Sequence, residues 1–269
     1  MKLWILSDIH TELTTDWDLP VPGEQPDFDA LIVAGDLMPG MEKGVHWLAE
    51  RVKDKPVVYI AGNHEGYGTD LEVTWSKAKD AARGTNILVM ENETTIIDGV
   101  RVIAGTLWTD FALFGNAVAA MRAAGKGMND YRRIVTDNHS RRLDPSDTLS
   151  RHRATVSYIE GELARAHDGP TVVVTHHAPY RGAIRRGHEN DILSAAYVTD
   201  LGGLILRHQP DLWVYGHTHQ SDDTRIGRTR IVSNAKGYGP HPALRRTTWE
   251  NTAFDPTFTV DIATSGGST

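Results

Sequence analysis

The sequence contains no cysteine. Disulfide bonds, thiolate metal ligands and thiol nucleophiles are therefore excluded. It also has no apolar run that approaches the roughly 20 residues of a membrane-spanning helix. No apolar segment of secretory length follows Met1, so we expect a cytoplasmic protein that does not associate with a membrane.

An excess of basic residues is missing as well. The formal net charge is -7 and the isoelectric point is near 6.0, which argues against a general nucleic-acid binder. Nucleic acid stays possible as a substrate, because bound metal ions can supply the charge that a phosphate needs. The 269 residues have ordinary globular usage, with 40% hydrophobic and 23% charged residues. We expect them to form a single domain over 1–269.

Short apolar runs rich in valine, isoleucine and leucine recur along the chain and end in polar or glycine-containing turns. Such runs are typical of strands buried on both faces. Stretches with helical spacing lie between them, as with Val45, Leu48 and Val52. The alternation predicts an α/β fold. The predicted strands are 2–7, 30–34, 57–61, 100–104, 171–175 and 212–215, and the predicted helices are 41–53, 70–83 and 150–167.

The alternation of predicted strands and helices is interrupted in two places. After Gly216 the pattern predicts further strands at 224–226, 229–233 and 258–262, followed by a frayed tail at 264–269. Residues 107–149 instead combine aromatic residues, a small-residue helix at 116–125 and a polar stretch at 136–147. Irregular segments of this length within a domain are usually lids or disordered inserts, and we predict a lid.

Acidic, histidine and amide residues follow the predicted strands directly. Because ligands bind at the carboxyl ends of strands in an α/β sheet, these side chains are expected to converge on one rim. Carboxylate and imidazole ligands together suit Mn, Fe, Zn or Ni ions, and a two-metal site needs a shared carboxylate. Glycines before three of the blocks let the backbone come close to the ions. The blocks are Asp8-Ile9-His10, Gly35-Asp36, Gly62-Asn63-His64-Glu65, His176-His177 and Gly216-His217-Thr218-His219.

Taken together and in this order, the five blocks resemble the calcineurin-like metallophosphoesterases. The resemblance implies a two-sheet β-sandwich flanked by helices, with two divalent metal ions at its rim. It further implies that a hydroxide held between the ions attacks the phosphorus of the substrate. The implied ligands are Asp8, His10 and His219 for the first ion, Asn63, His176 and His217 for the second, and Asp36 as the bridge.

The same resemblance gives His64 a catalytic role outside the ligand set. This imidazole would donate to the substrate or protonate the leaving oxygen, and we expect Glu65 to be paired with it. His177, next to the ligand His176, is either a support for that ligand or a packing residue.

Several further candidates keep an ordinary alternative. The basic run 181–186, with Arg181 as its first member, either meets a phosphate or forms a solvated loop. Asn129 and Tyr131 either contact substrate or belong to the start of a packed helix. The stretch 234–239 is either a loop that approaches the site or a simple turn.

The resemblance therefore implies a metal-dependent hydrolase of small phosphoesters. Diesters are favoured over monoesters because the chain is similar to short stand-alone members of the family. Two alternatives stay open: a nuclease acting on DNA or RNA, and a metal-poor scaffold with the same fold that binds another protein. A phosphoprotein phosphatase is disfavoured, because no extended insert for docking a peptide is visible.

Overall fold

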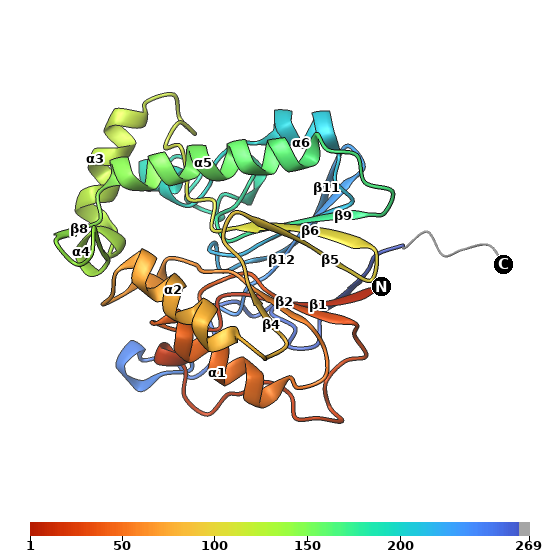
Figure 1. The fold of residues 1–269 in the computed structure, drawn as a ribbon. Helices are drawn as coiled ribbons and strands as arrows, with labels where there is room; N and C mark the ends of the chain where they lie inside the picture. Colours follow the sequence, from red (N-terminus) through yellow and green to blue (C-terminus); the bar gives the residue numbers. More distant parts are fainter. Residues whose placement is uncertain (264–269) are drawn as a thin grey trace.

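The computed structural model describes residues 1–263, and it packs two β-sheets face to face between two layers of helices (Figure 1). The predicted frayed tail at 264–269 lies outside the described residues. The first sheet has the order β13-β1-β2-β3-β4, with β13 antiparallel to β1 and the other pairs parallel. Its strands are β1 (Lys2–Leu6), β2 (Ala30–Val33), β3 (Val57–Tyr59), β4 (Ile87–Val89) and β13 (Thr259–Asp261).

The second sheet has the order β11-β12-β10-β9-β6-β5. Its central strands β12, β10, β9 and β6 are parallel, and the two edge strands pair in antiparallel fashion. The predicted α/β sandwich of two sheets is thus confirmed. The strands are β5 (Glu93–Ile97), β6 (Val100–Gly105), β9 (Thr171–Thr175), β10 (Leu212–Tyr215), β11 (Ser221–Ile226) and β12 (Thr229–Asn234).

Alternation along the strands explains why continuous apolar runs are needed. Successive side chains of a strand point to opposite faces of its sheet. In β1, Leu3 and Ile5 enter the core between the two sheets, whereas Trp4 and Leu6 pack against the helices outside. In the second sheet, Val173 of β9 likewise faces the outer helices while its two neighbours face the sandwich interior. Both faces are buried, so both sets of positions must be apolar.

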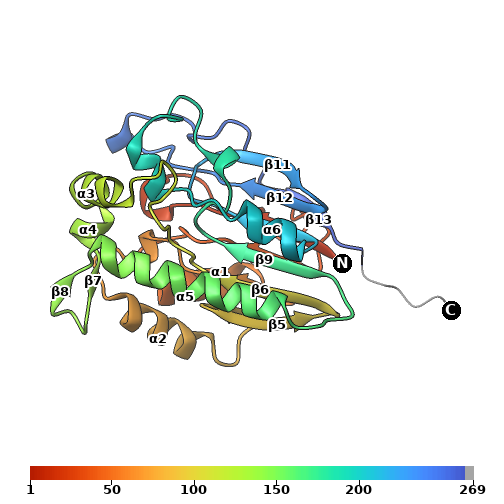
Figure 2. The same ribbon diagram turned by 90° about the horizontal axis from the view of Figure 1, so that it is seen from above.

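Helices cover the outer face of each sheet. Beneath the first sheet lie α1 (Met41–Arg51) and α2 (Leu71–Ala82), and on the second lie α5 (Pro145–Leu163) and α6 (Gly202–His208) (Figures 1 and 2). α5 starts five residues before its predicted start because Asp144 and Asp147 form a capping box around Pro145. β4, β5 and α6 were not predicted, since each is short or only partly apolar. None of the helices within 1–263 has the length and apolarity to span a bilayer.

The segment predicted as a lid is largely structured. It contains α3 (Ala117–Gly127), α4 (Asp130–Arg133), a short hairpin of β7 (Val135–Thr136) and β8 (Arg141–Arg142), and the start of α5. Trp108, Phe111 and Ile134 are buried in the core beneath the outer helices of the second sheet. The segment therefore packs as part of the helical layer, and whether it opens and closes stays a prediction.

Candidate metal centre

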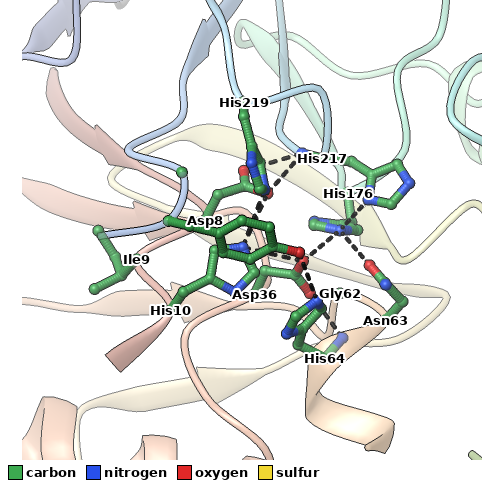
Figure 3. Close-up of polar contacts among 12 residues, drawn as sticks. Asp8, Ile9, His10, Asp36, Gly62, Asn63, His64, His176, His217 and His219 are labelled. Carbon is green, nitrogen blue, oxygen red and sulfur yellow. Dashed lines mark hydrogen bonds and ion pairs between the residues drawn. The ribbon is translucent and has the colours of Figure 1, made fainter. Parts of the chain in front are cut away.

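The predicted ligands meet where the two sheets share a rim. Those from the first sheet follow β1, β2 and β3, and those from the second follow β9 and β10. Every one of these side chains is at most about one tenth exposed. Figure 3 shows that they point toward a common centre from both sides of the sandwich. They are Asp8, His10, Asp36, Asn63, His176, His217 and His219.

One group of donor atoms gathers around the Asp8 side. Nε2 of His10 lies 3.1 Å from Nε2 of His219, and the latter lies 3.4 Å from a carboxylate oxygen of Asp8. Asp36 Oδ2 completes this group at 3.6 Å from Nε2 of His10. Four side chains thus offer atoms close enough to share one ion.

A second group gathers on the other side of the same Asp36 oxygen. Nε2 of His176 lies 3.2 Å from Asn63 Oδ1, 3.1 Å from Nδ1 of His217 and 3.5 Å from Asp36 Oδ2. Oδ2 of Asp36 is therefore common to both groups. A carboxylate in this place can bridge two ions, as a two-metal site requires.

The hydrogen bonds behind the rings show that these groups fit cations. Nδ1–H of His176 donates to the Ala34 carbonyl at 2.8 Å, and Nδ1–H of His219 donates to Glu250 at 2.8 Å. Each bond fixes the tautomer, so that in the neutral ring the Nε2 lone pair faces the other donors. Lone pairs of nitrogen and oxygen at such distances repel one another unless a proton or a metal ion lies between them. The donor set therefore fits two divalent metal ions.

The pKa values of the histidine rings also indicate that this site favours positive charge. Burial disfavours charged His176, but the carboxylate of Asp36 outweighs it and raises the pKa to about 10. Burial also disfavours the charged form of His219, but its hydrogen bonds to Asp8 and Glu250 prevail and raise its pKa to about 9. Burial lowers the pKa of His10 to about 4, assisted by the nearby His64. Each group of donors thus contains one ring that holds a proton when no metal is bound.

Backbone strain accompanies the ligands. A positive φ is uncommon outside glycine, and it persists only where the surrounding structure enforces it. The left-handed turns directly after the strands aim the side chains back over the rim. Among the ligands the residues with positive φ are Asp8 (54°), His10 (49°), Asp36 (57°), His217 (68°) and His219 (52°).

The glycines of the motifs provide space. A Cβ on Gly62 would lie 2.2 Å from Asp36 Oδ1 and 2.7 Å from Cε1 of His176. A Cβ on Gly216 would lie 2.6 Å from Asp8 Oδ2. Neither glycine has a positive φ, so close approach of backbone to ligand, and not a turn, requires them.

These features agree with the comparison of the whole chain with known families. The family of calcineurin-like phosphoesterases matches residues 1–221. The chain belongs to this family. Like other calcineurin-like phosphoesterases, it is a hydrolase whose buried histidine and aspartate groups form a candidate centre for two metal ions.

Individual relatives of this phosphoesterase are distant. The uncharacterized protein L509 of Acanthamoeba polyphaga mimivirus is 25% identical over 96% of this chain and 95% of its own length. The phosphopantetheinyl hydrolase PptH of Mycobacterium tuberculosis has a similar fold, with a TM-score of 0.63, 21% identity and coverage of 91% of this chain and 92% of its own. A putative 5'-nucleotidase of Staphylococcus aureus is less similar, with a TM-score of 0.48, 16% identity and coverage of 86% of this chain and 48% of its own.

The expected pairing of Glu65 with His64 is wrong. The buried Glu65 carboxylate accepts hydrogen bonds from the backbone N–H groups of Asp36, Leu37 and Gly62 and from the Tyr59 hydroxyl. It therefore ties the loops after β2 and β3 together beneath the bridging aspartate. Burial, together with the charge of Asp36, raises the pKa of Glu65 to about 7.

The partner of His64 is Glu12. Nδ1 of His64 lies 2.8 Å from Glu12 Oε1, and the backbone N–H of His64 donates to Asp36 Oδ1 at 2.8 Å. The sequence could have indicated this residue, because Asp8, His10 and Glu12 occupy every second position.

A cavity of about 300 Å³ opens in front of the ligands. Asn129 lines it, whereas two other predicted substrate contacts, Arg181 and Tyr131, do not. Nη1 of Arg181 donates to the Leu113 carbonyl at 2.6 Å, and the Tyr131 hydroxyl lies 3.1 Å from that of Thr148. His177 packs between two aromatic rings. The centroid of its ring lies 4.9 Å from that of Trp108 and 4.2 Å from that of His217.

Three further residues line the cavity, two from stretches that the sequence named as candidates and one from outside every block and candidate stretch. Arg185, four residues beyond Arg181, is the member of the basic run that lines the cavity. Tyr238, from the 234–239 loop, lies with its hydroxyl 3.3 Å from Nε2 of His64. Glu250 lies 31 residues after His219 and belongs to no motif block, yet its hydrogen bond to Nδ1 orients that ligand.

Proposed function

We infer that this chain hydrolyses small phosphodiesters with two divalent metal ions, of which Mn, Fe, Zn and Ni suit the donor set. The observation that carries the proposal is the single Oδ2 oxygen of Asp36, common to both groups of donor atoms. When bound, the ions supply hydroxide from water near neutral pH and offset negative charge on the phosphoryl oxygens. Asp8, His10 and His219 would hold one ion, Asn63, His176 and His217 the other, and Asp36 both.

His64 is the proposed proton donor for the leaving oxygen. Burial disfavours its charged form, but Asp36 and the bond to Glu12 outweigh this and raise its pKa. With Nδ1 held by Glu12, Nε2 is the atom presented toward the cavity, beside the Tyr238 hydroxyl. A ring whose pKa is raised and whose direction is fixed is suited to general acid catalysis.

The charge on the cavity wall supports a diester. Arg185 is the one guanidinium or ammonium group among the described residues that line the cavity, and Glu250 pairs with it at 2.9 Å. A phosphate monoester carries up to two negative charges near neutral pH and a diester carries one. A wall with so little free positive charge suits the monoanion.

The second ester group has an apolar surface to lie against. Met128, Leu193 and Val198 line the cavity together with Tyr67 and Tyr197. Such a mixture of apolar and aromatic walls with few polar groups is usual for sites that bind small organic molecules. The alternative of a nuclease has less support, because the cavity wall formed by residues 1–263 offers no row of cationic side chains to follow a nucleic-acid backbone.

The decisive experiment compares Mn²⁺-reconstituted protein on bis(p-nitrophenyl) phosphate and p-nitrophenyl phosphate. We expect a higher kcat/KM for the diester and near-complete loss of turnover in Asp36→Asn, with the fold retained by circular dichroism. Unchanged turnover in Asp36→Asn contradicts the metal mechanism. Preference for the monoester contradicts only the choice of substrate, and cleavage of single-stranded DNA at comparable kcat/KM would favour the nuclease.

A further inference from the structure

A buried carboxylate from the 107–149 segment reaches the metal ligand Asn63. Asp130 is the first residue of α4 and is only 2% exposed. Its Oδ1 accepts hydrogen bonds from Asn63 Nδ2 at 2.8 Å and from the Tyr67 hydroxyl at 2.7 Å. Asp130 lies 67 residues from Asn63 in the chain and belongs to none of the five motif blocks.

This contact decides which end of the Asn63 amide faces the metal centre. The oxygen and nitrogen of an asparagine side chain have nearly the same shape, and only the oxygen can bind a cation. Oδ1 of Asp130 already accepts from the Tyr67 hydroxyl, so it can bond to the amide only by accepting from an N–H as well. Asp130 therefore requires Nδ2 on its own side, which leaves Oδ1 facing His176 Nε2 at 3.2 Å.

The same carboxylate holds a second side chain of the site. Tyr67, bonded to Asp130, places its ring 4.1 Å from the ring of His64 at an interplanar angle of 31°. The Arg133 guanidinium covers this tyrosine ring at 4.4 Å, and the Arg133 carbonyl accepts from the backbone N–H of Gly68 at 2.9 Å. α4 thus clamps the loop that carries Asn63 and His64.

The segment that provides Asp130 also meets the cavity. Gly127, Met128 and Asn129, the three residues before it, line the cavity wall. A shift of this segment would therefore change the cavity wall and the orientation of a metal ligand together.

We propose that Asp130 is a positioning residue for the second metal ion. By fixing the rotation of the Asn63 amide, it links occupation of that site to the position of the 107–149 segment. The inference rests on the proposed function, since it assigns a role within the same metal centre. Loss of a hydrogen-bonding partner of a ligand typically weakens metal affinity or activity by about 10- to 100-fold.

The test measures Mn²⁺ stoichiometry and affinity by calorimetry for the wild type, Asp130→Leu and Asp130→Asn. Leucine has a similar size but cannot accept a hydrogen bond, so we expect the second ion to bind about 10- to 100-fold more weakly and the first to bind unchanged. Turnover in Asp130→Leu should recover at high Mn²⁺. Asp130→Asn keeps an acceptor oxygen, so its affinity for the second ion should fall much less than that of Asp130→Leu. At limiting metal, the electron paramagnetic resonance signal of a coupled Mn²⁺ pair is expected for the wild type and that of a single Mn²⁺ ion for Asp130→Leu.

Asp147→Leu is the matched control, because it removes a carboxylate from the same segment at the start of α5, where Asp147 bonds to Arg141 and the backbone of Asp144. We expect it to lower the melting temperature without changing metal stoichiometry. Equal Mn²⁺ affinity in the wild type and a folded Asp130→Leu would overturn the role of Asp130. If Asp130→Leu does not fold, weaker binding of the second ion with unchanged binding of the first in Asp130→Asn supports the role, and wild-type affinity for both ions in Asp130→Asn contradicts it. A wild type that binds no metal contradicts the proposed function itself.

Discussion

Oε1 of Glu12 lies 2.8 Å from Nδ1 of His64 and so holds the proposed proton donor of this phosphoesterase in a fixed direction. Burial favours the neutral form of Glu12, but its hydrogen bonds with His10 and His64 prevail and lower its pKa to about 2. The carboxylate is therefore ionised throughout the working pH range, and its charge helps to keep the imidazole protonated.

Glu12→Gln should slow the reaction in a way that depends on the leaving group. The amide keeps the shape of the side chain but removes the charge, so the pKa of His64 falls and less of it carries a proton. We expect kcat to fall about 10- to 100-fold for diesters with alkyl leaving groups, which is a part of the roughly 100- to 10,000-fold that general acid catalysis usually contributes. p-Nitrophenolate leaves without protonation, so its esters should be much less affected. Steady-state kinetics with both classes of ester, and with the exposed Glu24→Gln as control, check this. Equal losses for the two leaving groups would contradict proton donation by His64.

Metal affinity should depend on pH through one imidazole in each group of donors. The pKa of His176 is raised to about 10 and that of His219 to about 9, whereas that of His10 is lowered to about 4 and that of His217 well below its usual value. At pH 7 the metal-free site thus holds a proton on His176 and on His219, and each ion must displace one. Below about pH 9 the apparent affinity for each ion should rise up to tenfold per pH unit as pH rises.

Calorimetric titration with Mn²⁺ in buffers of different ionisation enthalpy measures the protons released. We expect about one from a histidine per ion at pH 7, and up to one more in all from the water that the two ions would hold as hydroxide. Release of no protons would show that these rings are already neutral in the metal-free protein. In Glu250→Gln the release associated with His219 should decrease, because that variant loses the carboxylate that helps to raise its pKa.

Gly62→Ala should disable the centre although it adds only a methyl group. That methyl would lie 2.2 Å from Asp36 Oδ1, so the bridging carboxylate or the loop after β3 must move. We expect loss of activity by at least about 100-fold, since misplacement of a catalytic group by about 1 Å has an effect of this size. Gly161→Ala is the control, because it is in the helix α5 and no heavy atom of the described part of the chain lies within 4 Å of its added Cβ. It should leave activity unchanged and stabilise the fold by about 0.5–1 kcal/mol, as thermal melts would show. Full activity in Gly62→Ala would contradict the tight packing described for the bridge.

Arg185→Gln should weaken substrate binding with little effect on kcat. This guanidinium lines the cavity and is shared with Glu250, so it meets the substrate as a partly neutralised charge. We expect KM for a diester to rise about three- to tenfold, roughly the 0.5–1.5 kcal/mol of one hydrogen bond in solvent contact. Arg186→Gln changes an exposed neighbour that does not line the cavity and should leave KM unchanged. Equal effects of the two variants would indicate general electrostatic attraction in place of a contact.

The sequence by itself determined the strands and the ligand types. The apolar runs of β1, β2, β9 and β10 must be buried on both faces, and a polar ligand directly after such a run can only emerge at the rim of a sheet. These are local properties of the chain, so residue type and position after a strand were enough to bring out the five blocks. The resemblance to the calcineurin-like metallophosphoesterases then implied which of their residues are ligands: Asp8, His10, Asp36, Asn63, His176, His217 and His219. β4 and α6 were missed because short elements of mixed polarity depend on their neighbours for stability.

The tertiary structure alone decided which groups support those ligands. Glu12 instead of Glu65 holds His64, Glu250 holds His219, and Asp130 holds Asn63. Glu65, although adjacent to His64, points to the backbone of neighbouring loops because the two residues are consecutive in the 3-10 helix His64–Gly66. Successive side chains of such a helix point about 120° apart. Glu250 and Asp130 lie 31 and 67 residues from their ligands in the chain, and no periodicity links these two to the motifs. Glu12 continues the spacing of Asp8 and His10, but it lies 52 residues from His64. Proximity through folding, which sequence spacing does not encode, is the physical reason that they appear only in three dimensions.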